Sequence, residues 1–379
     1  TFADDQARQA CLEAFDMNKD GHLSLQELRN VTDEQTKTAF QTATARQIRQ
    51  FPEFRFFKSV KTLTSQLRNM SALENVSLPY GLTTLGSEAF SGCSNLKEIT
   101  LPSKLSTLES RAFYGSAVEN IFVDPFNSSF VSRDGIVFTA KNKLVAYPNG
   151  KSGEEIVLPG VISEIAPGAV HKVPGMKRVY FDTDDAYTIP VMDHEGIATE
   201  DGTLPDVYVS DATHDATLYE DIVGHKSWAA YVSANKLHRY FPLRIADAVT
   251  STFDNDGSKR YIGSMYIGFD AQLPAGLTPY TVRAADEVNY KAYLQARPSA
   301  VPALAPVLIF ADQPGLYRLY PAANELESWP VSENRLEGVR RSGMELNQMH
   351  SAQGSIHTPQ MNAEGEMYFH HEKENLITS

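Results

Sequence analysis

Hydrophobic positions in the middle of the chain recur with a period of 23 residues, so that residues 73–92 are matched by residues 96–115. After an insertion the pattern returns at residues 156–170. Ile99 and Leu101 alternate with polar residues, which predicts a short strand with one buried face. Pro102 then ends the strand, because proline cannot donate to a ladder. One such unit cannot bury its apolar face alone, so we expect stacked units with a shared core.

A helical pattern precedes the repeats. Ala7, Cys11, Leu12 and Phe15 recur at near-helical spacing, and a second helix is expected from Leu25 onward. Between them, residues 16–27 read Asp-Met-Asn-Lys-Asp-Gly-His-Leu-Ser-Leu-Gln-Glu, which fits the twelve-residue calcium loop of helix-loop-helix proteins at each defining position. The sequence therefore predicts a Ca²⁺ site near the N-terminus.

The predicted calcium ligands are oxygen donors, which a hard cation prefers. Five would offer side-chain oxygens, with Ser24 acting directly or through water, and one would offer its backbone carbonyl; in loop order they are Asp16, Asn18, Asp20, His22 (carbonyl), Ser24 and Glu27. A merely acidic turn is the alternative. Residues 31–50 hold no second loop, so we expect a structural clamp rather than a paired sensor.

The C-terminal third has a different pattern. Short aromatic and β-branched runs, such as those at residues 261–269 and 307–310, are separated by Gly and Pro, which is typical of antiparallel β structure. We therefore predict an α+β, mostly β fold: an N-terminal helix-loop-helix calcium hand (residues 1–40), a curved repeat solenoid (41–245) with a hairpin insert near 120–150, and a C-terminal antiparallel β domain (246–379).

Composition narrows the classes of partner. The 379 residues fit two or three domains, and a net charge of −13 argues against nucleic acid, which proteins bind by neutralising phosphates. No apolar stretch is long enough to cross a bilayer. Because the chain begins at Thr1, we expect that a leader was removed, and a lipid anchor is left open. Cys11 and Cys93 are expected to pack as small apolar side chains.

Signatures of common enzymes are absent from the sequence, including Gly-x-Ser-x-Gly, His-Glu-x-x-His and the phosphate-binding glycine loops. A pair of carboxylates for glycoside hydrolysis could still be formed by the fold. We therefore predict a non-catalytic binding or adhesion protein that presents a protein or glycan ligand surface. The alternative is an exported carbohydrate-binding or carbohydrate-active accessory protein that acts through its C-terminal β domain.

The repeat itself points to a family. Leu-x-x-Ile-x-Leu-Pro and Ala-Phe within residues 96–113, with Gly-Cys-Ser-Asn-Leu at 92–96, resemble the BspA-like leucine-rich repeats of bacterial surface proteins, over about residues 55–245. The resemblance implies a leucine-rich-repeat solenoid, export to the cell surface or medium by Bacteroidetes, and for some members adhesion to host or bacterial surface proteins.

In such a solenoid, strand residues between the buried positions face outward. The outward residues form the predicted ligand surface; in chain order they are Asn75, Ser77, Glu98, Thr100, Glu155, Val157, Arg178 and Tyr180. A solvated sheet face without a ligand is the alternative for each of them.

Overall fold

The structure, a computed structural model, describes residues 2–159, 162–182, 191–192, 196–210, 222–245, 250–252, 259–286, 291–329, 357–361 and 367–371. The chain forms two compact units. The N-terminal unit comprises residues 1–180, 188–207 and 224–236, and the C-terminal unit comprises residues 181–187, 208–223 and 237–379. No helix in the described ranges is long and apolar enough to span a bilayer.

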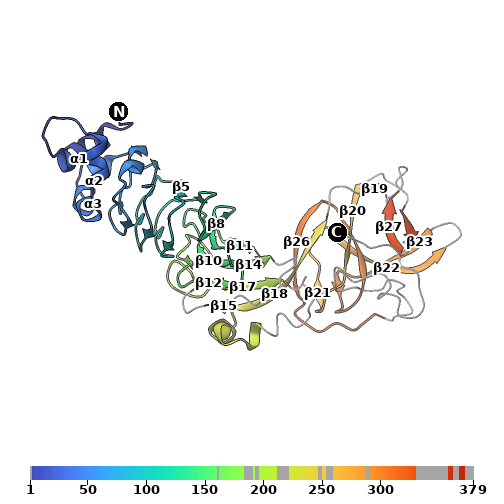
Figure 1. The fold of residues 1–379 in the computed structure, drawn as a ribbon. Coiled ribbons are helices and arrows are strands. Elements are labelled where there is room, and N and C mark those ends of the chain that lie inside the picture. Colours follow the sequence, from blue (N-terminus) through green and yellow to red (C-terminus); the bar gives the residue numbers. More distant parts are fainter. Residues whose placement is uncertain are drawn as a thin grey trace. The chain divides into compact units, whose positions relative to one another are not determined.

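Three short helices begin the N-terminal unit: α1 (Asp5–Phe15), α2 (Leu25–Asn30) and α3 (Asp33–Ala39). Each starts at a residue whose side chain accepts backbone N–H groups of the first turn, namely Asp4, Ser24 and Thr32. Ser24 and Thr32 form capping boxes with Glu27 and Gln35. Figure 1 shows the three helices together at one end of the stack of coils.

Phenylalanine side chains join these helices to the first coil. The ring centroids of neighbouring rings in this cluster lie 5.0 to 6.2 Å apart, in mostly edge-to-face pairs, and each ring is at most 2% exposed. The cluster comprises Phe15 from α1, Phe40 from the end of α3, Phe51 from β1 (Gln50–Phe51), and Phe54 and Phe57 from η2 (Pro52–Phe56) and its C-cap. We call these five residues the phenylalanine cluster. Contacts between aromatic rings in such arrangements stabilise a core beyond their burial.

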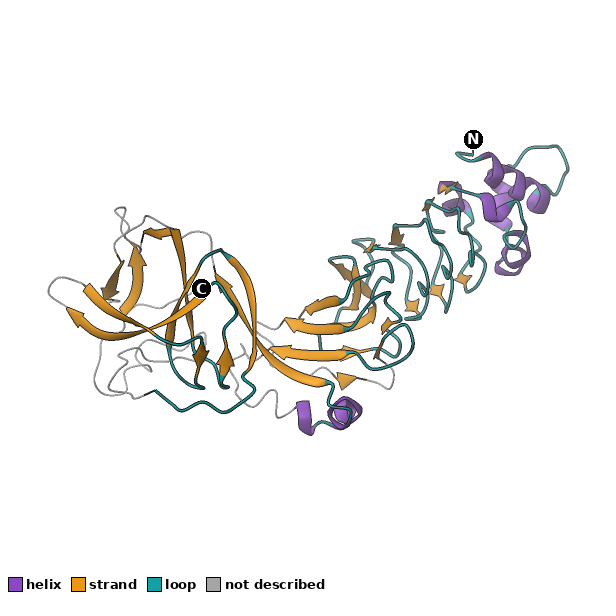
Figure 2. Cartoon of the chain, turned by 180° about the vertical axis from the view of Figure 1, so that it is seen from behind, coloured by secondary structure: helices purple, strands orange, loops and turns teal. Residues whose placement is uncertain are grey.

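The coils place short parallel strands side by side in rows, joined by loops (Figure 2). One row pairs β1 with β3 (Asn75–Val76) and β5 (Glu98–Leu101) with β7 (Asn120–Val123), and another pairs β2 (Thr62–Leu63), β4 (Thr84–Leu85) and β6 (Thr107–Leu108). The strand β5 ends directly before Pro102, as predicted. Later coils contribute β11 (Glu155–Pro159), β12 (Glu164–Ile165), β13 (Val170–His171) and β14 (Arg178–Asp182).

A continuous core fills the coils. Buried residues from Ala7 to Ala146 form one cluster, so the helices and the repeats share the same apolar interior. Phe90 and Phe113, which are 23 residues apart, stack with centroids 5.7 Å apart and planes 6° from parallel. The predictions of a mostly β fold and of a solenoid of stacked repeat coils are confirmed.

The hairpin insert interrupts the row formed by β2, β4 and β6. Its strands are β8 (Phe130–Arg133), β9 (Ile136–Thr139) and β10 (Lys143–Ala146), in a sheet ordered β15-β12-β10-β9-β8 with β15 at Val191–Met192. These strands lie within the range 120–150 predicted for the insert, and its first residues, 120–123, form β7, which pairs in parallel with β5 as a coil strand.

The N-terminal unit ends in further short elements. These are β16 (Ile197–Ala198), the first residues of β17 (Asp206–Ser210), η3 (Lys226–Trp228) and α5 (Ala229–Ser233). Trp228 and Tyr231 are buried with ring centroids 5.4 Å apart, and the Tyr231 hydroxyl donates to the Ile197 carbonyl at 2.8 Å. Large aromatic rings can cover the last apolar face of a stack of coils, and the buried Tyr231 hydroxyl keeps a hydrogen-bond partner there.

The C-terminal unit contains two antiparallel sheets. One has the order β18-β26-β21-β24 and the other β19-β20-β25-β22-β23. Their bounds are β18 (Leu237–Ile245), β19 (Thr250–Thr252), β20 (Lys259–Met265), β21 (Ala271–Gln272), β22 (Leu277–Asp286), β23 (Lys291–Ala296), β24 (Ala300–Val301), β25 (Val307–Ala311) and β26 (Gly315–Pro321). Every side chain of β25 is buried, so both faces of that strand are covered. A hairpin, β27 (His357–Met361) with β28 (Met367–His371), completes the described strands.

Both cysteines are free and buried, as predicted. Burial raises the pKa of each thiol, and that of Cys93 rises to about 12. The Cys93 thiol donates to the Leu67 carbonyl at 3.1 Å. Both thiols therefore act as small core groups rather than as nucleophiles.

The Asp4 carboxylate links α1 to the first strand of the solenoid. Its Oδ1 accepts the N–H groups of Gln6 and Ala7 at 2.8 and 3.1 Å, and its Oδ2 accepts those of Arg49 and Gln50 at 2.9 and 3.2 Å. Partial burial raises the pKa of Asp4, but these four hydrogen bonds lower it more, and the net pKa lies below the usual value for aspartate.

We predict that Asp4→Ala lowers the free energy of unfolding by about 2 kcal/mol at neutral pH, because a helix cap and two strand contacts are lost together. A group with a lowered folded pKa stabilises above its unfolded pKa of about 4, and its contribution disappears as pH falls through the folded value. The difference between the wild-type chain and Asp4→Ala, measured by urea unfolding, should therefore shrink in acid. Asp5→Ala is the matched control, since the Asp5 side chain is 96% exposed and should change stability little.

Candidate calcium loop and ligand-binding face

The predicted calcium loop connects α1 to α2. Asp16 follows α1 directly, and its Oδ2 accepts the Gly21 N–H at 2.9 Å. Its Oδ1 is buried and has no hydrogen-bond partner. Gly21 has a φ of +78°, a backbone conformation that favours glycine and permits the tight turn at this position. The unpartnered carboxylate oxygen is a group that a cation would satisfy.

The next polar residues hold the loop by local hydrogen bonds. The Asp20 N–H donates to Asn18 Oδ1 at 3.0 Å, and the His22 N–H donates to Asp20 Oδ1 at 2.8 Å. Asn18 Nδ2 also donates to Asp20 Oδ2 at 2.9 Å. Leu23 packs against the buried core cluster, so the loop is anchored to the interior of the N-terminal unit.

Glu27 closes the loop by contacts to both of its ends. Its Oε2 accepts the N–H and the hydroxyl of Ser24 at 2.9 and 2.8 Å, and its Oε1 accepts the Met17 N–H at 3.1 Å. These bonds, those from Ser24 first, lower the pKa of Glu27. The carboxylate is thus ionised, and the same residue that would ligate calcium caps α2.

The donor set of the loop fits calcium in kind, because carboxylates, an amide, a hydroxyl and a backbone carbonyl are all oxygen donors. In the conformation described, the carboxylates of Asp16, Asp20 and Glu27 do not converge into a metal-binding group, and no such group of His, Cys, Asp or Glu is found elsewhere among the described residues. Coordination by Glu27 would compete with its bonds to Ser24 and Met17.

The outward strand residues of the repeats lie on one sheet face of each coil. Asn75, Glu98, Thr100, Glu155 and Val157 are exposed, whereas the residues between them are buried. Ser77 is half-buried. Exposed and buried side chains thus alternate along each strand, as expected for a strand with one buried face.

Two residues of the predicted ligand surface differ from that description. Tyr180 is only 1% exposed, and its neighbours Val179 and Phe181 are also buried. Successive strand residues point to opposite faces, so both faces of β14 are covered here. The expectation that Tyr180 faces outward is wrong. Arg178 is half-buried, and its Nε lies 2.9 Å from Glu155 Oε1.

Two further residues of the same face, Asn120 and Phe122 of β7, were not predicted from the sequence. Phe122 is 43% exposed, and Asn120 pairs in register with Glu98. The sequence does contain a signal for them. Ile121 follows Ile99 by 22 residues rather than 23, so the outward positions of this repeat lie one residue earlier than the regular period predicts. We call Asn75, Ser77, Glu98, Thr100, Asn120, Phe122, Glu155, Val157 and Arg178 the sheet face.

Ion pairs between successive coils flank the sheet face. Lys97 Nζ lies 2.7 Å from Glu119, and Lys177 Nζ lies 2.6 Å from Glu154. Arg49 pairs with Glu74 in the first coils. Exposed pairs of this kind contribute little stability. The ion pairs do balance the charges of the residues beside the sheet face. The feature that distinguishes the face is therefore its exposed apolar side chains, Phe122 and Val157.

Residues 26–145 match the family model described as a BspA type leucine-rich repeat region, in six copies. The resemblance recognised in the sequence is confirmed over this stretch, which begins within α2 and ends within the hairpin insert. A search of curated proteins finds no match.

Three solved structures are similar to part of the chain. Pneumococcal vaccine antigen PcpA is 22% identical over 44% of this chain and 46% of its own, with a TM-score of 0.31. A leucine-rich cell surface protein from Faecalibacterium prausnitzii and a leucine-rich repeat protein from Eubacterium ventriosum are each 14% identical over 40% of this chain, with TM-scores of 0.27. The alignments to those two span 55% and 51% of the neighbours' lengths.

Proposed function

We propose that this chain, whose residues 26–145 carry BspA-type leucine-rich repeats, is a non-catalytic binding or adhesion protein that acts at a cell surface or after secretion. The observation that carries the proposal is the sheet face, a set of outward residues repeated on successive coils, of which those from Asn75 to Phe122 lie over one continuous buried core. Stacked repeats supply extended surfaces suited to macromolecular ligands. An origin in Bacteroidetes stays a prediction.

The partner that the sheet face fits best is a protein of a host or bacterial surface. Phe122 is 43% exposed on β7, and aromatic side chains are enriched in protein interfaces. Val157, which is 42% exposed, extends the apolar part of the face. The ion pair of Arg178 with Glu155 leaves no net charge at that position. A glycan ligand held by the C-terminal unit remains the alternative function.

We further propose that residues 16–27 bind one structural Ca²⁺ ion through Asp16, Asn18, Asp20, the His22 carbonyl, Ser24 and Glu27. The buried, unpartnered Oδ1 of Asp16 supports this assignment. Phe15 precedes the loop and belongs to the phenylalanine cluster, and Leu23 packs on the same core. Ion binding would therefore stabilise the end of the solenoid rather than switch a surface.

Calcium should raise the melting temperature of the chain, and a chelator should reverse the rise. At a calcium concentration about 100 times the dissociation constant the gain is about 2.7 kcal/mol. Asp16→Ala and Glu27→Gln should abolish the calcium-dependent rise. Glu34→Gln, which removes an exposed acid outside the loop, is the matched control and should retain it. A melting temperature indifferent to calcium would show that the metal assignment is wrong.

Binding through the sheet face is tested with an array of host matrix proteins, bacterial surface polymers and glycans probed with the purified chain. For a protein that binds saturably, Phe122→Ser should weaken binding at least tenfold, because buried aromatic anchors dominate interface energies. Phe126→Ser is the matched control, since Phe126 is 88% exposed but lies outside the strand.

Equal losses in the two variants, or none in either, would contradict a role for the sheet face. A glycan that binds both variants as tightly as it binds the wild-type chain would favour the C-terminal unit as the binding domain.

A further inference from the structure

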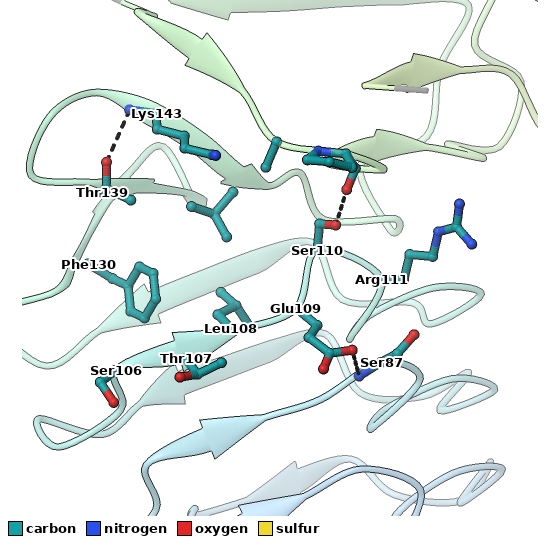
Figure 3. A pocket seen from close by; sticks show the side chains of 13 residues that line it. Ser87, Ser106, Thr107, Leu108, Glu109, Ser110, Arg111, Phe130, Thr139 and Lys143 are labelled. Atoms are coloured by element: carbon teal, nitrogen blue, oxygen red, sulfur yellow. Dashed lines mark hydrogen bonds between the residues drawn. The ribbon is translucent and has the colours of Figure 1, made fainter. Parts of the chain in front are cut away.

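A cavity of about 560 Å³ opens between β6 and the hairpin insert, within the N-terminal unit. Figure 3 shows Leu108 and Phe130 on one side of it and Thr139 and Lys143 on the other. Its size is within the range of ligand-binding pockets. Neither the calcium loop nor the sheet face contributes to its lining.

The cavity exists because the hairpin breaks the strand row of the coils. The strand β6 is the last strand of the sheet β2-β4-β6. The next strand of the row in space, β10, pairs with β9 on one side and with β12 on the other. The edge of β6 is therefore left without a neighbouring strand in that sheet, although Ser110 of the same coil donates directly to the Pro167 carbonyl of the next.

At this edge, one residue of β6 has backbone groups that an added strand could pair with. The N–H groups of Thr107 and Glu109 donate toward β4, to the carbonyls of Thr83 and Leu85 at 3.0 and 2.9 Å. Alternate residues of a strand direct their N–H and C=O groups to opposite edges, so those of Leu108 point to the open side. An added strand would pair there, as peptides do at exposed sheet edges.

The side chains around this edge define what an added strand must carry. Along the sheet, Thr62, Thr84 and Thr107 form one column in register, and Leu63, Leu85 and Leu108 form the next. Leu108, Phe130 and Val145 line the cavity and retain 8%, 7% and 6% exposure. An aliphatic side chain that follows Leu108 in its column would cover this apolar surface.

The lining favours a segment without charge. The Glu109 carboxylate accepts the Ser87 N–H at 2.7 Å, and Lys143 pairs with Glu164 of β12. The guanidinium of Arg111 also interacts within the chain, and the hydroxyl groups of the remaining serine and threonine residues complete the polar part of the lining: Ser87, Ser106, Thr107, Ser110 and Thr139. These groups hydrogen-bond neutral polar side chains such as threonine or serine.

We propose that this cavity binds an extended, uncharged peptide segment of a partner protein, with a β-branched polar residue followed by an aliphatic one, as a strand added to the edge of β6. The segment would continue the Thr and Leu columns of β2, β4 and β6 for one more position. The site is separate from the sheet face, so it gives the chain a second protein contact.

The test uses the full chain and a fluorescent, end-blocked peptide, Gly-Ser-Thr-Leu-Ser-Gly, in a fluorescence anisotropy titration. Saturable binding is expected. The same peptide with N-methyl groups on its Thr and Leu amides keeps the side chains but loses ladder donors, so it should bind at least tenfold more weakly. Thr107→Trp, which places a large ring at the mouth of the cavity, should weaken binding by a similar factor.

Thr62→Trp is the matched control because Thr62 lies in the same column two strands away, about 9–10 Å from Thr107. It should bind the peptide like the wild-type chain, as should Phe122→Ser. Absence of saturable binding by the wild-type chain would overturn the proposal. Equal affinity for the N-methylated peptide would overturn it too, since capture would then depend on side chains and not on strand addition.

Discussion

Each coil of the solenoid exposes an apolar face that only another coil or a cap can cover, and this requirement determines most of the N-terminal unit. At its start the cover is the phenylalanine cluster, which brings α1, α3 and the first coil into one aromatic core. The helices are therefore part of the solenoid interior. A loop that follows Phe15 and places Leu23 on the same core is in a position to influence the stability of every coil behind it.

The hairpin insert keeps the apolar core covered but interrupts the backbone pairing between coils. Its strands extend the row of β12 and β15 and continue the buried interior through Val137 and Val145, so the apolar core is not interrupted. Backbone pairing is interrupted, because β9 occupies the edge of β10 that would otherwise face β6. Proteins usually cover or shorten such edges. Here the edge borders a cavity, which is why we regard it as a site rather than a defect.

The sequence predicted the parts of the fold that depend on local pattern. The alternation at Ile99 and Leu101, the strand end before Pro102 and the buried positions of Phe90 and Phe113 all follow from a regular period. Other features depend on tertiary contacts. Tyr180 alternates like an outward residue but lies on a strand covered on both faces, and Phe122 was displaced by a repeat one residue shorter. The phenylalanine cluster follows no period. In the calcium loop, Ser24 and Glu27 satisfy two patterns at once, those of a calcium ligand set and of a capping box, and only the structure shows the capping contacts.

We infer that the N-terminal helices and the repeats form one cooperative scaffold behind the sheet face. Hydrogen–deuterium exchange of the full chain tests it most directly, because amides that open together share one protection free energy. We predict that the amides of α1 from Arg8 onward exchange with the same protection as the hydrogen-bonded amides of β4 and β6, which in β6 is that of Thr107. If α1 instead exchanged freely while β4 and Thr107 stayed protected, the helices would be a separate module and the inference of one cooperative scaffold would be wrong.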